Sequence, residues 1–429
     1  MIPAELIEKK RDGIELTPGE IGWFIHNVTI ETIDDCQLSA LLMSIYFNGM
    51  TDNETTSLVD SMVKSGKRFN FNHLERYIAD KHSTGGIGDK ISFILAPLLS
   101  SFDIIVPMIA GRGLAYTGGT IDKLESIKNF QTQKDFNSFT EQIDQIGCGI
   151  ISQSSEICPA DKKLYSIRDL TGTIPSLPLI CSSIMSKKIA EGLDGLVMDI
   201  KVGNGAFMKT FQEAKNLGVE LKKIGNSFDI DISITYSNMS QPLGEYAGLK
   251  CEIIEAVDCL KGTGPDDVTQ LSIDLCANVL VQSGISTNKY EAKTLLLKNI
   301  NNGKALEKFE EMIEAQGGDL NDIYSKNNFA RNHIKIKSRE TGYIKSINTE
   351  KIGWALVEMG CGKKVTSDTL DHSAGIKINY KVGDKVYKGD TVYELFGFNE
   401  KKLKNAKIML KNNFITSEQK QKRKKLIIE

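Results

Sequence analysis

The sequence predicts an α/β (α+β) protein of several domains, with a small helical domain, a larger α/β domain built on a central mixed sheet, and a C-terminal β-rich subdomain. Three observations lead to this expectation. The 429-residue chain exceeds the ~250–300 residues at which single hydrophobic cores stop growing. Helix signals fill the first 66 residues, whereas short apolar runs alternate with helical segments after about residue 75. From about residue 340, short strand-like runs separated by tight turns prevail.

Residues 1–66 have the signals of a helical bundle. Pro18 opens a segment in which apolar side chains recur at helical spacing. Residues 38–46 form a second apolar-rich segment, which ends before Gly49. Thr51 is a helix N-cap with a carboxylate just inside the next helix. We therefore expect several short helices that share one core.

Strands and helices alternate in the middle of the chain. Strand-like runs lie at residues 104–109, 193–202 and 229–236, and helical segments such as 211–225 separate them. This order implies right-handed βαβ units and a sheet with a parallel part. Residues 159–190 interrupt the alternation with more helix, which we expect to return to the N-terminal bundle.

These patterns give the expected organisation. Residues 381–390 contain two tight turns between short strands, which suit a small β-sandwich that resembles the hammerhead of lipoyl domains. The expected bounds are 1–66 and 160–194 for the helical domain, 72–158 and 196–335 for the α/β domain, and 340–429 for the C-terminal subdomain.

Composition excludes several classes of protein. The net charge is −2, from 53 basic and 55 acidic residues, so neither nucleic acid nor a membrane surface is an expected partner. No apolar run approaches the ~20 residues of a membrane span, and the charged N-terminus is no signal peptide. The eight cysteines form no CxxC pair, and no zinc-ligand spacing occurs. We expect a cytoplasmic protein with reduced thiols, without a metal or an organic cofactor, whose basic residues 420–425 are solvated.

Two glycine-rich segments carry the signals of an anion site. The first, KHSTGGIGDK (residues 81–90), combines glycines that free backbone N–H groups with hydroxyl donors and lysine. The second, GRGLAYTGGTIDKLE (residues 111–125), follows the strand at 104–109 and opens a helix with Thr120 near its N-cap. Each could be only a turn or a cap. Two such loops after neighbouring strands favour a phosphate site at the C-terminal edge of the sheet.

A third group of polar residues lies in the helical insertion. Ser183 and Lys187 are four residues apart and share a helix face, and Arg168 lies on the preceding helical segment. Two cations and a serine on one face are consistent with plain surface solvation. They are also suited to hold the polar edge of a base and to neutralise its charge as it leaves.

Four motifs together resemble the thymidine and pyrimidine-nucleoside phosphorylases, the class II nucleoside phosphorylases. They are KHSTGGIGDK, GRGLAYTGGTIDKLES, PADKKLYSIRD and LICSSIMSKKIAEGLDGLVMDIKVGNGAFM, in that order from residue 81 to residue 208. The resemblance implies phosphorolysis of uridine, thymidine or deoxyuridine to a free base and (deoxy)ribose 1-phosphate, with inorganic phosphate as co-substrate. It also implies a homodimer formed through the helical domain, with phosphate on the α/β side and the base on the helical side.

The resemblance further implies roles for individual residues. His82, Arg168 and Lys187 are expected to be catalytic, with His82 as proton donor or polariser near the base O2 and the sugar, and the two cations stabilising the departing pyrimidine. Phosphate is expected to contact Lys81, Ser83, Ser92 and Thr120. The base is expected to contact Arg168, Ser183 and Lys187 and an apolar wall of Leu114, Ile174, Ile180, Ile184 and Phe207.

The sequence departs from the family pattern around the sugar and phosphate. Ala110 replaces a serine that contacts phosphate in the family, and Tyr116 replaces a histidine. We consider the Tyr116 hydroxyl a substitute donor that reaches toward phosphate or the pentose. Lys90 replaces a threonine of a cation site whose other members correspond to Gly88, Leu243 and Glu255; its ammonium either replaces the ion or faces solvent.

Two interpretations compete with phosphorolysis, and the first follows from these departures. Ala110 and Tyr116 leave open a nucleoside hydrolase or a glycosyltransferase of altered substrate on the same scaffold. A non-catalytic nucleoside-binding protein is a third possibility. The retained Lys81, Arg168 and Lys187 argue against it.

Overall fold

Short capped helices build the N-terminal bundle. The computed structural model describes residues 1–325, 330, 332–364 and 368–428. Reciprocal capping boxes at Thr17 and Thr51 begin two of the helices, as the N-cap signal at Thr51 predicts. Their apolar faces pack into a common core. The four helices are α1 (Pro3–Arg11), α2 (Pro18–Thr29), α3 (Asp35–Asn48) and α4 (Asp52–Lys64).

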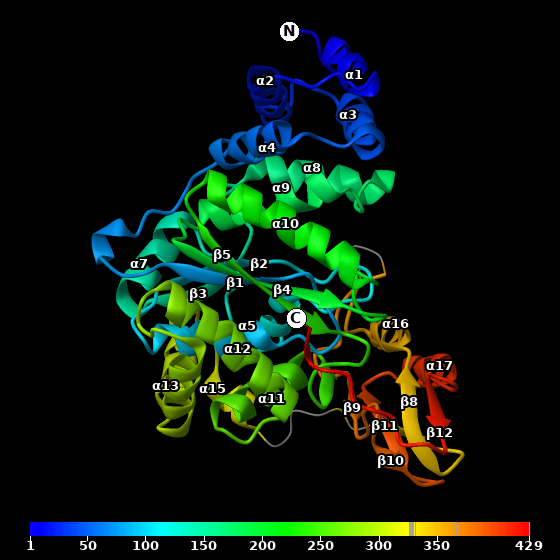
Figure 1. The fold of residues 1–429 in the computed structure, drawn as a ribbon. Coiled ribbons are helices and arrows are strands. Elements are labelled where there is room, and N and C mark those ends of the chain that lie inside the picture. The colour runs from blue at the N-terminus through cyan, green and yellow to red at the C-terminus, as the bar shows by residue number, and fades with distance from the viewer. Residues whose placement is uncertain (326–329, 331, 365–367, 429) are drawn as a thin grey trace.

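The helical insertion returns to this bundle. It consists of α8 (Pro159–Thr171) and α9 (Leu177–Ala190). Leu164 of α8 and Leu179 of α9 belong to the core of the bundle, which confirms the packing expected for residues 159–190. Met185, also on α9, packs instead into the core beside the central sheet. Helix α9 therefore joins the bundle to the sheet (Figure 1).

The central sheet has a parallel body. Strands β1 (Ala79–Ser83), β4 (Gly195–Val202) and β5 (Asp231–Asn238) pair in parallel. Strands β2 (Val106–Ala110) and β3 (Cys148–Ser152) form a second parallel pair. A hydrogen bond from the Ala79 N–H to the Ile105 carbonyl oxygen, at 2.9 Å, places this pair beside β1. The three predicted strands are all present, with ends shifted by a few residues.

Helices cover both faces of the sheet (Figure 1). Helix α10 (Phe211–Ser227) lies with α9 on one face, and α5 (Ile91–Ser100) and α12 (Asp266–Gln282) lie on the other. The other helical elements of this part are η1 (Asn72–Leu74), α6 (Thr120–Leu124), α7 (Phe136–Ile146), α11 (Lys250–Leu260), α13 (Lys289–Asn301), α14 (Lys304–Ala315) and α15 (Leu320–Tyr324). Within the described ranges, no helix is long and apolar enough to cross a membrane.

The C-terminal part is rich in strands, as the sequence predicts. It has one sheet of order β10-β8-β12 and one of order β6-β9-β11-β7, in which β6 (Tyr246–Gly248) is contributed by the α/β part of the chain. The remaining elements are β7 (Asn332–Lys337), β8 (Gly342–Ile347), α16 (Thr349–Met359), β9 (Gly375–Ile378), β10 (Lys385–Val386), β11 (Thr391–Gly397), α17 (Glu400–Met409) and β12 (Phe414–Ser417).

The last residues depart from the expected solvated tail. The basic side chains of residues 420–425 are exposed, in agreement with the sequence. After them, however, β13 (Ile427–Ile428) pairs antiparallel with β5 and adds a strand to the central sheet. Leu426 and Ile427 pack against the core that contains α5 and α12. This short apolar segment after the basic run is therefore part of the folded domain.

Candidate active site

The first glycine-rich loop follows the C-terminal end of β1. Ser83 ends the strand, and its Oγ accepts the N–H of Gly85 at 3.2 Å. Gly88 has φ of +79°, and a Cβ there would lie 2.2 Å from the Leu243 oxygen. Only glycine therefore allows the loop to approach residue 243. Ser92 lies on the first turn of α5, directly after this loop.

Lys81 on β1 belongs to a buried network of charges. Its Nζ lies 3.5 Å from Asp89 Oδ1, and Lys201 Nζ lies 3.8 Å from the other oxygen of the same carboxylate. Burial lowers the pKa of Lys81, and Asp89 opposes this shift. Burial also opposes the ionisation of Asp89, but Lys201 and Lys81 outweigh it and lower the pKa of that carboxyl well below its usual range. Asp89 is therefore ionised and holds both ammonium groups.

His82 is partly exposed at the end of β1. Burial, and then the positive charges of Lys188, Lys187 and Lys81, lower its pKa well below 6.5. The imidazole is therefore neutral at physiological pH, and the one proton it has to offer is that of a neutral N–H group. Of the two expected roles, the electrostatics favour the polariser over the proton donor.

The second loop follows β2 and lies beside the first. Thr120 is the first residue of α6, and the cap position is Gly119, without a side-chain cap bond, so capping is not the role of Thr120. The carboxylate of Asp122 accepts the Gly113 N–H at 2.7 Å and shapes the loop. Lys123 donates to the Asp89 carbonyl oxygen of the first loop at 2.7 Å. The two loops, on neighbouring strands, are thus connected at the same edge of the sheet. Lys123 was not among the predicted site residues, because nothing in its spacing marks this contact.

The polar groups of the helical insertion are not surface residues. Arg168 is 3% exposed, and its two Nη atoms donate to the carbonyl oxygens of Leu179 and Ile174 at 2.9 and 2.8 Å. Burial lowers the pKa of Arg168, against the charge of Asp161. The arginine holds the turn between α8 and α9. The surface-solvation interpretation of these residues is wrong.

Lys187 has a buried counter-charge that sequence reasoning missed. Its Nζ lies 2.5 Å from Asp161 Oδ2 and 3.0 Å from Ser183 Oγ, so the predicted proximity of Ser183 and Lys187 is found. Asp161 is buried, and its Oδ1 has no hydrogen-bond donor among the described residues. The aspartate lies within the motif PADKKLYSIRD, but its 26-residue separation from Lys187 gave no periodic signal.

The residues expected to form the apolar wall come from two places. Ile180 and Ile184 are on α9 and contact the core beside the sheet. Leu114 and Phe207 lie in the segments that follow β2 and β4. Ile174 lies in the turn that Arg168 holds. Ile174, Ile180 and Ile184 thus belong to the α8–α9 region that carries Arg168, Ser183 and Lys187, whereas Leu114 and Phe207 come from loops of the α/β part.

Tyr116 is not a substitute donor to phosphate, contrary to the sequence expectation. It is buried, and its hydroxyl donates to the Ala206 carbonyl oxygen at 3.0 Å. Its ring lies 5.7 Å from Phe207 and 5.8 Å from Trp354 of α16, centroid to centroid. The tyrosine packs between two loops and the C-terminal subdomain. Its size and aromaticity, which suit this packing, explain its orientation.

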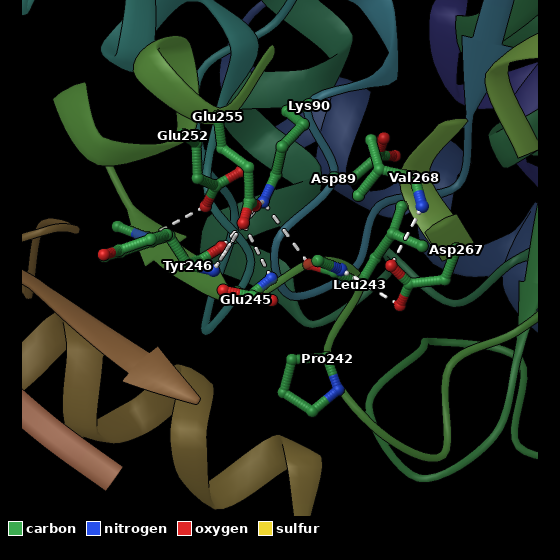
Figure 2. Close-up of polar contacts among 12 residues, drawn as sticks. Asp89, Lys90, Pro242, Leu243, Glu245, Tyr246, Glu252, Glu255, Asp267 and Val268 are labelled. Atoms are coloured by element: carbon green, nitrogen blue, oxygen red, sulfur yellow. Dashed lines mark hydrogen bonds and ion pairs between the residues drawn. The ribbon is translucent and has the colours of Figure 1, made fainter. Parts of the chain in front are cut away.

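Lys90 is buried at the first loop, so the alternative that it faces solvent is wrong. Its Nζ binds Glu255 and donates to the carbonyl oxygens of Tyr246, at 2.7 Å, and Leu243, at 3.4 Å (Figure 2). Burial lowers and Glu255 raises the pKa of Lys90, and the net direction is upward. Burial raises the pKa of Glu255, yet this carboxylate also accepts the N–H of Glu245 at 2.8 Å. We therefore assign an ionised pair.

Family matches show that this combination of a helical bundle with an α/β domain is that of a glycosyltransferase. The chain matches the glycosyl transferase family in both parts, the helical bundle domain at residues 4–66 and the a/b domain at residues 75–306. It also matches the pyrimidine nucleoside phosphorylase C-terminal domain at residues 343–417. A crystal structure of anthranilate phosphoribosyltransferase from Thermus thermophilus shares the fold, with TM-score 0.57 and 14% identity over 73% of this chain and 99% of that one.

Curated relatives narrow the class. Pyrimidine-nucleoside phosphorylases from Staphylococcus aureus (strain MSSA476) and Staphylococcus epidermidis (strain ATCC 12228 / FDA PCI 1200) are each 43% identical over 390 residues, which is 90% of either chain. The chain belongs to the pyrimidine-nucleoside phosphorylase family, and it is a pentosyltransferase by that membership.

Proposed function

We propose that the protein catalyses the phosphorolysis of pyrimidine nucleosides, uridine, thymidine or deoxyuridine, to a free base and (deoxy)ribose 1-phosphate. The observation that carries this proposal is the pair of glycine-rich loops on neighbouring parallel strands, connected by the bond from Lys123 to Asp89. Such an edge is the usual ligand position of α/β sheets. The families of the matching domains support the same reaction.

Inorganic phosphate is the proposed co-substrate, and the scheme uses no organic cofactor. Lys81 and Ser83 on β1, Ser92 on α5 and Thr120 on α6 are the proposed contacts. Lys81 supplies positive charge, and Asp89 holds its ammonium at the end of the strand. Thr120 begins a helix without capping it, so its hydroxyl is available to an anion together with the loop N–H groups.

The base is proposed to bind against α8 and α9. Phosphate attacks C1′ while the glycosidic bond breaks, and negative charge develops on the pyrimidine. Lys187 stabilises this charge by its ammonium group, and Ser183 binds the polar edge of the base. Because both Arg168 Nη atoms hold backbone carbonyls, Arg168 contributes its charge and fixes the backbone at Ile174 and at Leu179, the residue before Ile180. The neutral His82 polarises the substrate as an N–H donor.

Lys90 is proposed to occupy the position of a monovalent cation. Its ammonium contacts a carboxylate and two carbonyl oxygens near Gly88, which are the oxygen ligands a hard cation prefers. A Cβ at Gly244 would lie 2.7 Å from Lys90 Nζ, so the ammonium is closely enclosed. The tethered charge fixes the 243–246 turn against the first loop without an exchangeable ion.

We also propose that the protein is a cytoplasmic homodimer. Support for the dimer comes from exposed apolar side chains on neighbouring helices of the bundle, with Phe47 of α3 76% exposed and Leu170 of α8 83% exposed. Large apolar side chains exposed on packed neighbouring helices are candidates for burial in a subunit contact. The eight free cysteines support a reducing compartment. The molar mass in solution tests the assembly.

One observation keeps a hydrolase as the second candidate. Ala110 ends β2 without a side-chain donor, and Tyr116 does not replace the missing donor. A weakened phosphate site would favour water as the nucleophile. A panel of pyrimidine nucleosides, each assayed with and without phosphate and with chromatographic identification of the sugar product, separates the two reactions and identifies the substrate.

A further inference from the structure

Three charged side chains are buried together between the sheet and helix α9. Asp80 precedes Lys81 on β1, and Lys188 and Glu191 are at the C-terminal end of α9. Their exposed fractions are 0% for Asp80, 1% for Lys188 and 0% for Glu191. Charged groups are rarely buried so completely unless they are paired. None of the three has a part in the proposed reaction.

The hydrogen bonds of this cluster connect three elements. Lys188 Nζ binds Asp80 of β1, donates to Glu191 Oε1 at 2.7 Å, and donates to the Ile109 carbonyl oxygen of β2 at 3.1 Å. Glu191 Oε1 also accepts the Ile109 N–H at 2.8 Å. The ammonium therefore uses all three of its donors. The cluster joins β1, β2 and α9 at one point.

Two oxygens of the cluster show how its charge is distributed. Within the described part of the chain, neither Asp80 Oδ1 nor Glu191 Oε2 accepts a hydrogen bond from an N–H or O–H donor. The carboxyl groups of Asp80 and Glu191 are within hydrogen-bonding reach of each other, so one proton between them gives the unpaired oxygens a partner. Burial, and also the hydrogen bond to Asp80, raise the pKa of Glu191 well above its ordinary value, against the charge of Lys188. One ammonium and one net negative charge then remain.

We propose that Glu191 holds one proton, shared with Asp80 through a hydrogen bond, that one negative charge therefore lies opposite Lys188, and that this neutral cluster is a positioning device that fixes helix α9 against strands β1 and β2. Lys187 and Ser183 belong to the same helix, and His82 and Lys81 follow Asp80 on β1. The cluster therefore sets the distance between the proposed base side and the proposed phosphate side. This consequence rests on the proposed function, whereas the charge distribution does not.

Infrared difference spectroscopy tests the shared proton. A protonated buried carboxyl group has a carbonyl band that a carboxylate lacks. We expect this band in the wild type and its loss in Glu191→Gln. We expect its loss in Asp80→Asn as well, because Glu191 must then ionise to balance Lys188. A wild type without the band, or a band that persists in Asp80→Asn, overturns the shared proton.

A double-substitution cycle tests the charge count by thermal unfolding. Each single variant keeps one counter-charge for Lys188, whereas Asp80→Asn combined with Glu191→Gln keeps none. We expect the double variant to lower Tm by clearly more than the sum of the single effects, because the buried ammonium then has no counter-charge. Adding Lys188→Met to the double variant should recover part of that loss. Additive single effects, or no recovery, contradict the proposal.

The matched control is the buried pair of Lys10 and Glu54 in the helical bundle. Its Nζ–Oε2 distance is 2.7 Å, and one carboxylate faces the ammonium. Glu54→Gln should therefore lower Tm as a single substitution, because no second carboxyl group of this pair is left to balance the charge of Lys10. It should leave kcat per folded molecule unchanged, because the Glu54 carboxylate binds Lys10 and the N–H groups of Leu16 and Thr51, none of which is on α9.

The positioning role is tested by separating kcat from phosphate binding. In the double variant, kept folded at low temperature, we expect kcat to fall by about 100-fold, the effect of a misplacement of about 1 Å. The dissociation constant for inorganic phosphate alone should stay near the wild-type value, because the loops at the sheet edge are intact. Unchanged kcat contradicts the positioning role. A wild type without phosphorolysis contradicts the proposed function instead, while the spectroscopic and stability results still decide the charge distribution.

Discussion

At the scale of single residues, base recognition depends on the charge of Lys187. Lys187→Ala should lower kcat/KM by at least ~100-fold, or ~2.7 kcal/mol, because the departing pyrimidine loses its counter-charge. The variant should also lose stability, since Asp161 is buried 2.5 Å from this ammonium. Adding Asp161→Asn should restore stability but not activity. Near-wild-type phosphorolysis by Lys187→Ala would show that the base binds elsewhere.

His82 gives a prediction about pH. Its pKa in the folded protein is lowered below 6.5, so the unfolded chain binds more protons as the pH falls through ~6.5. The stability associated with neutral His82 is present above this pH and is lost below it, by up to ~1.4 kcal/mol per pH unit for one proton. We expect His82→Gln to show a weaker loss of stability between pH 7 and pH 5. If denaturant titrations showed equal losses of stability in the two proteins, His82 would have to be protonated as readily in the folded protein as in the unfolded chain.

At the scale of elements, the sequence predicted where the two loops lie but not how every side chain in them is oriented. Their glycines, their order and their position after β1 and β2 were predictable, because turn chemistry and strand order are local signals. The orientation of Tyr116 was not, because it depends on Trp354 of α16, which is distant in sequence. Strand β13 was not predictable either, because its two residues are too few to form a periodic pattern. Asp161 and Lys123 were missed because their partners are also distant.

The orientation of Tyr116 leads to a prediction for the phosphate site. Ala110→Ser should tighten phosphate binding by ~10–150-fold, the worth of ~1.5–3 kcal/mol for a hydrogen bond to a charged group, because Tyr116 leaves that position open. Tyr116→Phe removes the bond to the Ala206 oxygen and the 3.4 Å hydrogen bond from Lys209 Nζ. Neither partner is a proposed phosphate contact, so the phosphate KM should stay unchanged. Phosphate titration of both variants measures this. A raised phosphate KM in Tyr116→Phe would show that the hydroxyl does contact phosphate.

The first loop gives a prediction about ions. Because the Lys90 ammonium is tethered against Glu255 and two carbonyl oxygens, activity should not change when sodium replaces potassium at constant ionic strength. Lys90→Thr removes the ammonium and should make activity depend on potassium. Rates of both proteins in the two chloride salts are the measurement. Potassium dependence of the wild type would show that Lys90 does not take the place of the ion.

At the scale of the whole molecule, the arrangement was predictable to a large extent. The alternation of strands and helices predicted the sheet, and the return of residues 159–190 to the bundle was confirmed by the shared core. The packing of α9 against both the bundle and the sheet was not predictable. Apolar side chains occur on all sides of this helix, so the sequence does not show which side packs against which element. That double contact places α9, which carries Ser183 and Lys187, between the bundle and the sheet. The charge of Lys187 acts there on His82 of β1.

The phosphate requirement tests the central claim most directly. Purified protein is incubated with uridine, thymidine or deoxyuridine, with and without inorganic phosphate, and the sugar product is identified. The account predicts release of base only when phosphate is present, with (deoxy)ribose 1-phosphate formed in equal amount. Release of free pentose at the same rate without phosphate would contradict phosphorolysis and would establish a hydrolase on this scaffold.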